Sequence, residues 1–344
     1  MKQIDLLLPF SLPPAELAKD LLRAAQAPSL ALLLARASAA PRVEFDDFAR
    51  ALPHEQWLAE KFGLPAPEES SPPVAAAAMA RFGQKPESGV WFILQPVHFH
   101  ITRDHLVLTD TRRLALSDAD ARSLFATAQQ SFEAAGMPLL YGDASHWFMR
   151  ADAWAGLQTA TPDAACGHNI DIWMPQGAQA RDWRKLQNEV QMDWHGGSVN
   201  TAREMQGLKP INSLWLWGAA TAGSDCASTY AAVTNLQGWA RALAQNSMPT
   251  SSLSTLLAKP PASALVMDDT LAEAALGGDW AEWLQRLQLL ERDCFAPILA
   301  ALKSGQLEAL RLLMTHNTRL AEFRVSRHQL RKFWQTPSLA RLAA

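Results

Sequence analysis

Short apolar runs of strand length, separated by segments with helical spacing, constrain this chain more than any other feature. The first run is Ile4–Leu8, interrupted only by Asp5, and later runs are Ala264–Met267 and Leu310–Met314. Short, strongly apolar runs of this kind are typical of buried strands. Between the last two runs, residues 280–302 have the apolar spacing of a helix. Strands that alternate with helices predict an α/β fold with a mostly parallel sheet.

The middle of the chain has a different order of elements. Two strands are predicted at Val90–Leu94 and Leu106–Asp110, and a helix capped by Ser117 runs to about Ala135. Two more strands are predicted at 137–141 and 147–150. Paired strands on either side of a helix are typical of an α+β domain.

The segment 65–86 is rich in Pro, Ala, Ser and Glu, and it marks the best domain boundary in the sequence. We therefore expect residues 1–85 and 221–344 to form the two parts of an α/β core. Residues 86–220 are expected to form an α+β domain inserted between them.

Four further helical segments are predicted from apolar spacing and capping residues. They cover residues 15–37, 45–62 and 228–243, and residues 180–206 with a break near His195.

Composition excludes several classes of protein. The 344 residues carry 31 Lys and Arg against 34 Asp and Glu, a net charge of −3, which excludes a broad basic surface for nucleic acid. The three cysteines are widely spaced and form no CxxC pair, which favours a reducing, cytoplasmic environment. No apolar stretch is long enough to cross a membrane. The glycines form no nucleotide-binding fingerprint, so no cofactor is predicted.

The densest polar cluster is the candidate ligand-binding site. Amides, an imidazole and a guanidinium recur there at spacings that share a helix face or cap the next helix. Such a set suits a small ligand that carries phosphate or carboxylate, and it equally suits a structural network. The residues are Asn188, Gln191, His195, Asn200, Arg203 and Asn212.

Two other groups of residues are candidates for a function. His98 and His100 lie two apart on a predicted strand, so both imidazoles share a face, but no carboxylate or cysteine completes a metal site at a familiar spacing. The chain ends in a basic tail that precedes Phe333 and Trp334, which favours a solvated helix face or a contact with an acidic partner. The basic residues are Arg324, Arg327, His328, Arg331 and Lys332.

Spaced residues between about 95 and 220 resemble archaeal-type cofactor-independent phosphoglycerate mutases. The likeness rests on Asn188-Glu189, His195, Val199-Asn200, Arg203, Gly207, Pro210-Ile211-Asn212 and Trp217-Gly218-Ala219, preceded by Leu108-Thr109-Asp110 with an Arg pair. The resemblance implies an alkaline-phosphatase-like core that carries an inserted domain. The whole chain also resembles a proteobacterial group, some members of which are labelled Rpf-cluster regulatory proteins.

The chain departs from the mutase pattern where that family binds its two metal ions. The family's first strand ends in Asp-Gly, whereas this one ends in Leu8-Pro9-Phe10, and Trp217 replaces an arginine. Two divalent ions need about six oxygen or nitrogen ligands and a nucleophile. The acids and histidine that remain late in the chain do not supply that set. They are Asp268, Asp269, Asp279, Asp293 and His316.

These departures predict a metal-free pseudoenzyme with a degenerate alkaline-phosphatase-like core. It would bind a small phosphorylated or carboxylated metabolite, or a protein partner, in a regulatory role. Two alternatives stay open: an active metal-dependent phosphoglycerate mutase or phosphatase, and a structural interaction module.

Overall fold

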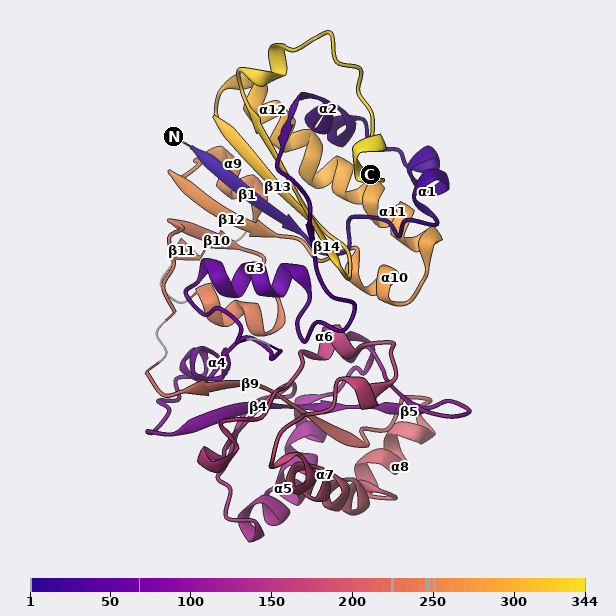
Figure 1. Ribbon diagram of the computed structural model, residues 1–344, viewed down its shortest axis with the longest axis vertical. Coiled ribbons are helices and arrows are strands. Elements are labelled where there is room, and N and C mark those ends of the chain that lie inside the picture. The colour runs from indigo at the N-terminus through magenta and orange to yellow at the C-terminus, as the bar shows by residue number, and fades with distance from the viewer. Residues whose placement is uncertain (1, 68, 224–225, 245–247, 250–251, 344) are drawn as a thin grey trace. The chain divides into compact units, whose positions relative to one another are not determined.

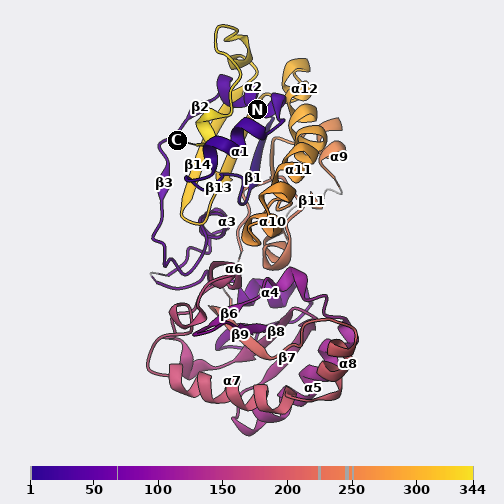
Figure 2. The same cartoon turned by 90° about the vertical axis from the view of Figure 1, so that its right-hand side faces the viewer.

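The computed structural model describes residues 2–343 except 68, 224–225, 245–247 and 250–251. The chain divides into two compact units (Figures 1 and 2). The first unit comprises Met1–Asp47 and Ala227–Ala344, and the second comprises Phe48–Cys226.

The first unit is built on a mixed sheet. Five strands run parallel in the order β11-β10-β12-β1-β13, and β14 then pairs antiparallel with β13 and with the short strands β2 and β3. The bounds are β1 Gln3–Leu8, β2 Ser38–Ala39, β3 Val43–Glu44, β10 Ala232–Thr234, β11 Met248–Pro249, β12 Ser263–Met267, β13 Ala309–Thr315 and β14 Arg319–Ser326.

One face of this sheet forms the hydrophobic core of the first unit. Ile4, Leu6 and Leu8 alternate along β1 and pack with the apolar faces of the helices. Full burial of each such side chain contributes about 1.5–3 kcal/mol. The helices are α1 Ala18–Ala24, α2 Pro28–Arg36, α9 Leu253–Ala258, α10 Ala272–Leu276, α11 Trp280–Leu290 and α12 Ala296–Ser304.

A π-helical turn, η5 (Glu291–Phe295), joins α11 to α12. Its first residue, Glu291, is buried, and its carboxylate accepts the backbone N–H groups of Ser29 at 2.8 Å and Leu30 at 3.1 Å. These groups begin α2, where backbone donors have no partner within the helix. Glu291 therefore caps α2 from a distant part of the chain.

The second unit is an antiparallel sheet, in the order β7-β8-β4-β9, between helices. Helices α5 and α7 cover one face, and α4 lies on the other (Figures 1 and 2). The bounds are β4 Val90–Val97, β7 Leu139–Asp143, β8 His146–Arg150, β9 Ser213–Thr221, α4 Ala75–Arg81, α5 Asp118–Ala134 and α7 Ala180–Trp194.

Tryptophan fills much of the core of the second unit. Trp147, Trp183, Trp194, Trp215 and Trp217 are among its largest fully buried side chains. The rings of Trp147 and Trp194 meet edge to face at 6.0 Å, a favourable geometry for aromatic pairs.

Shorter elements complete the second unit. They are α3 Pro53–Lys61, β5 Phe99–Ile101, β6 Leu106–Leu108, η1 Thr111–Arg113, η2 Asp152–Trp154, α6 Pro162–Ala165, η3 Ile170–Ile172 and α8 Ser198–Met205. In the first unit the remaining elements are η4 Gly238–Ala244, η6 Gln329–Arg331 and η7 Ala340–Leu342.

The predicted mixed α/β class is confirmed. The break between α7 and α8 falls where His195 predicts it, and the long helical segment beyond residue 280 forms as α11, η5 and α12. The first boundary between the units falls after Asp47, whereas the composition places it at residue 85. The Ala-rich helix α4 packs on β4 and β9, so this segment belongs to the second unit.

Three helix predictions differ from the structure. The helix over 228–243 is wrong, because Ala232–Thr234 pairs with β12 as a parallel strand. Only Pro53–Lys61 of the segment 45–62 is α-helical, and the segment 15–37 divides into α1 and α2. Both α2 and α3 begin at a proline, which disfavours helical geometry in the preceding residue.

The basic tail is not a helix face. Arg324 lies in β14, and of the other basic residues of this segment only Arg331 lies in a helical turn, η6. Within the described residues, none of the helices combines the length and apolar character that a bilayer crossing requires.

Candidate functional site

The carboxyl ends of the parallel strands in the first unit form the edge at which open α/β sheets usually carry ligands. There β1 is followed by Pro9 and Phe10. Phe10 is 3% exposed, and its backbone has φ 55°, a left-handed conformation that favours glycine. Its N–H donates to Thr315 Oγ1 at 3.4 Å, and its carbonyl accepts the indole N–H of Trp283 at 2.9 Å. An aromatic residue with a left-handed backbone thus lies directly after the end of β1.

Asp268 directly follows β12, His316 directly follows β13, and Asp279 precedes α11. Asp268 accepts the N–H of Thr270 at 3.0 Å, and Asp279 accepts the N–H of Glu282 at 3.0 Å as the cap of α11. Burial, and then Arg319, lowers the pKa of His316. Among the described residues, Asp268, Asp279 and His316 belong to no group of three His, Cys, Asp or Glu ligand atoms close enough to share one ion.

Asp5, the acid nearest the start of the chain, lies in the middle of β1, where other side chains bind its carboxylate. It is 2% exposed, accepts the hydroxyl of Tyr230 at 2.6 Å, and pairs with the guanidinium of Arg311 on the adjacent strand. Burial, reinforced by Asp5, raises the pKa of Tyr230 above its usual value. Burial opposes the charge of Arg311, but Asp5 outweighs it and the pKa of Arg311 is raised. Asp5, Tyr230 and Arg311 thus belong to one polar cluster within the sheet.

Three of the six predicted ligand-binding residues hold the backbone: Asn200 and Arg203 are buried, and Asn212 is half-buried. Asn200 donates to the carbonyls of Trp194 at 3.1 Å and Ile211 at 2.9 Å, and it accepts the N–H of Ile211 at 2.8 Å. Asn212 exchanges two hydrogen bonds with the backbone of Phe99, at 2.7 and 3.0 Å. These amides fix the loop that leads into β9.

Arg203 is 1% exposed and reaches three backbone carbonyls. Its Nε donates to Lys209 at 2.9 Å, and its terminal nitrogens donate to Leu114 and to Ala115. Burial lowers its pKa, while Asp120, at 3.7 Å, favours the charge. Its donors therefore join α8 to the turn after η1.

The other three residues lie on the surface of the second unit. Asn188 and Gln191 are exposed on α7, and exposed His195 ends that helix. The predicted cluster therefore falls into two sets in the structure. Asn200, Arg203 and Asn212 bond to the backbone, whereas the other three residues are exposed. Trp217, for which the resemblance implies the place of an arginine, is 1% exposed in β9, so its indole lies in the core.

His98 and His100 lie close together, with ring centroids 6.4 Å apart. His98 is buried, and its Nδ1 lies 2.8 Å from the carbonyl oxygen of Pro210, whereas His100 is exposed. Neither belongs to a metal-compatible group among the described residues.

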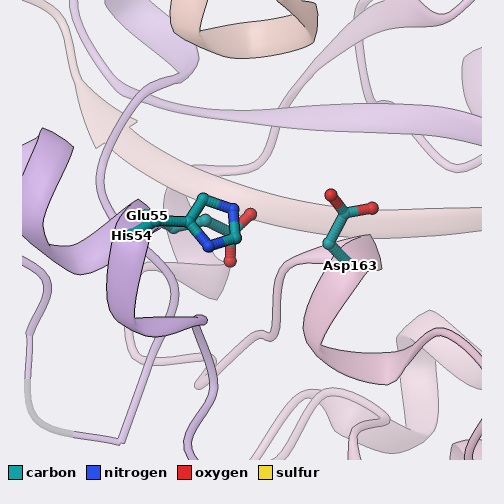
Figure 3. A group of neighbouring side chains, drawn as sticks. All are labelled: His54, Glu55 and Asp163. Carbon is teal, nitrogen blue, oxygen red and sulfur yellow. The ribbon is translucent and has the colours of Figure 1, made fainter. Parts of the chain in front are cut away.

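The group that the sequence did not reveal comprises His54, Glu55 and Asp163 in the second unit. Each offers a nitrogen or oxygen atom, and these atoms lie within 4.8 Å of one another. Figure 3 shows that His54 and Glu55 come from the start of α3 and Asp163 from α6. His54 is 4% exposed and Glu55 is 2% exposed, while the side chain of Asp163 is 25% exposed.

Surrounding groups fix both carboxylates. Glu55 Oε2 accepts the hydroxyl of Thr161 at 2.6 Å and the N–H of Leu52 at 2.8 Å. Asp163 accepts two hydrogen bonds from Arg112, at 2.9 and 3.1 Å, and the Nε of Arg112 lies 2.8 Å from Asp110. Burial opposes the charge of Arg112, but Asp163 and Asp110 outweigh it, so its pKa is raised.

Burial lowers the pKa of His54 to about 4, against the opposite effect of Asp163 and with a smaller contribution from Arg112. The imidazole is therefore neutral at neutral pH and retains a lone pair for a ligand. Nearby Cys166 is buried, and burial followed by Asp163 raises its thiol pKa well above the usual value. The thiol is thus protonated and unsuited to nucleophilic attack.

Signals for this group in the sequence are weak, because His54-Glu55 and Asp163 are remote along the chain. Both segments share one local pattern: a proline begins a short helix, and the acid follows it in the first turn. That pattern identifies helix starts, but it does not reveal that the two helix starts meet.

Comparison with known proteins gives a fold and no family. No protein-family model and no curated protein matches the chain. Several solved structures are similar to it, including two of low sequence identity. One is the PH0037 protein from Pyrococcus horikoshii, 12% identical, with a TM-score of 0.53 over 94% of this chain and 87% of that one. The other is the cofactor-independent phosphoglycerate mutase from Thermoplasma acidophilum, 14% identical, with a TM-score of 0.44 over 100% of this chain and 94% of that one. At these identities the likeness to PH0037 concerns the fold alone.

Proposed function

We propose that this protein is a catalytically silent relative of the cofactor-independent phosphoglycerate mutases, with a regulatory binding role. The observation that carries the proposal is the closed carboxyl edge of the parallel sheet. Pro9 and Phe10 offer no side-chain ligand atom there, and among the described residues Asp268, Asp279 and His316 belong to no group of three ligand atoms close enough to share one ion. Phosphoryl transfer through two ions needs several convergent ligands and an activated nucleophile at one place.

The ligand bound in this regulatory role would be a small phosphorylated or carboxylated metabolite. The exposed amides and imidazole of Asn188, Gln191 and His195 support this part of the proposal, since they leave polar groups at the surface for an anion. Binding by these three residues stays a prediction. The widely spaced free cysteines support a cytoplasmic location.

A mutase assay with 3-phosphoglycerate and added Mn²⁺ tests catalytic silence. We expect no conversion above background and no pair of tightly held ions per chain. Turnover that depends on Mn²⁺, with loss of turnover in Asp268→Asn, would contradict the proposal. Exposed Asp171→Asn is the matched control, because it removes a carboxylate away from the sheet edge.

A thermal shift with 3-phosphoglycerate tests the ligand. Ligand at a hundredfold its Kd stabilises a protein by about 2.7 kcal/mol. We expect the gain in melting temperature to fall in His195→Ala, and an equal gain in both proteins would exclude the exposed imidazole from binding.

A protein partner is the second candidate, and one observation favours it. Phe333 and Trp334 are 84% and 69% exposed, and they follow the basic residues Arg331 and Lys332. Exposed aromatic side chains beside basic ones are typical of binding surfaces. Loss of a co-purifying partner in a variant with both aromatics changed to Ser would support this role.

A further inference from the structure

A histidine and two carboxylates of the second unit lie close together and are largely removed from solvent. Glu55 and His54 are 2% and 4% exposed, and the side chain of Asp163 is 25% exposed. Their ligand atoms lie within 4.8 Å of one another. Buried carboxylates are costly unless they are paired, hydrogen-bonded or coordinated to a metal ion.

The side chains have the chemistry of a transition-metal site. We infer that His54, Glu55 and Asp163 bind a single divalent transition-metal ion, with Zn²⁺ as the best match. One imidazole nitrogen with two carboxylate oxygens is a familiar set for zinc, whereas calcium and magnesium prefer oxygen alone. All three ligands lie in the second unit, whereas the edge of the parallel sheet belongs to the first.

The three ligand atoms need to approach one another only slightly to bind one ion. Bonds of about 2.0–2.2 Å to zinc place neighbouring ligand atoms roughly 3.4 Å apart in a tetrahedron. The three atoms lie within 4.8 Å of one another, so side-chain rotations that move each ligand atom by about 1 Å bring them onto one ion. Three protein ligands leave the fourth position for water or a small anion.

The hydrogen bonds around the group are those of a supported metal site. Thr161 and the N–H of Leu52 orient the Glu55 carboxylate, and Asp110 orients Arg112 against Asp163. A carboxylate has about four lone-pair positions, so Asp163 can accept Arg112 and still bind the ion. Outer partners of this kind commonly fix the ligands of metal sites.

Zinc titration of the full chain, after removal of metal with a chelator, tests the inference. We expect one Zn²⁺ per chain by isothermal calorimetry and by metal analysis after dialysis. Asp163→Asn, at a partly exposed position, should weaken binding by tenfold or more, as should His54→Gln. The controls Asp171→Asn and His100→Gln alter exposed residues of the same types and should bind zinc as the parent does.

Two outcomes would overturn the inference: the parent chain fails to bind Zn²⁺ at micromolar concentrations, or Asp163→Asn binds it unchanged. If His54→Gln does not fold, Asp163→Asn decides alone, with circular dichroism as the check of its fold. Substitution with Co²⁺ gives an independent readout, since the parent should show visible absorption bands that Asp163→Asn lacks. Asp268→Asn separates this inference from the proposed function. If the parent binds one ion and Asp268→Asn still binds it, the result supports both the zinc site and the proposed function. If the parent binds a second ion that Asp268→Asn loses, the result refutes the proposed catalytic silence but not the zinc site.

Discussion

His54 makes the stability of the metal-free second unit depend on pH in a direction that can be calculated. Burial lowers its pKa from 6.5 to about 4, so between these values the unfolded chain binds a proton that the folded chain does not. Stability due to this group is therefore complete above about pH 6.5 and is lost as the pH falls toward 4. The full difference of about 2.5 pKa units corresponds to roughly 3 kcal/mol. Between pH 7 and pH 5 the expected loss is about 2 kcal/mol.

Urea unfolding of the parent chain and of His54→Gln, each at pH 7 and pH 5 with a chelator present, measures this loss. Contributions of other titrating groups largely cancel in the comparison, so the parent should lose about 2 kcal/mol more than the variant. His100→Gln, a change at an exposed imidazole, should keep the pH dependence of the parent. Equal losses in the parent and in His54→Gln would refute the claim that burial dominates the titration of His54.

Three other predictions concern residues that hold the fold. Phe10→Gly should be more stable than Phe10→Ala by about 1 kcal/mol. Both variants lose the buried ring, but only glycine adopts the left-handed backbone conformation without strain. Equal midpoints of urea unfolding for the two variants would contradict this prediction. Arg203→Met should lower the unfolding free energy by about 3 kcal/mol, since it deprives buried carbonyls of their donor, whereas exposed Arg184→Met should change it by less than about 0.5 kcal/mol. Glu291→Ala should cost about 1–2 kcal/mol through loss of the α2 cap, and faster amide exchange at Ser29 and Leu30 would identify the cause.

Much of the fold follows from local patterns in the sequence. The apolar runs at β1, β12 and β13 are long enough, and apolar enough, to specify buried parallel strands. The strand at Ala232–Thr234 escaped prediction because it is short and its flanks are rich in helix-forming residues. Its pairing with β12 is a tertiary contact, which propensity does not encode.

The roles of polar residues were harder to predict, because spacing along a helix does not reveal depth. Asn200 and Arg203 lie at positions that suit a ligand site, yet both side chains are turned inward to backbone carbonyls. Conversely, His54 and Asp163 meet only after two distant helix starts pack together. Partners that folding brings together are visible only in three dimensions.

The bend at Phe10 also makes the sheet edge a starting point for protein engineering. The backbone there already has the geometry that glycine accommodates with least strain, although an aromatic residue adopts it. Replacing Pro9 and Phe10 by aspartate and glycine would supply a carboxylate at the strand end without rerouting the chain. A designer who wished to install a metal there would have to choose the remaining ligands but could keep the scaffold.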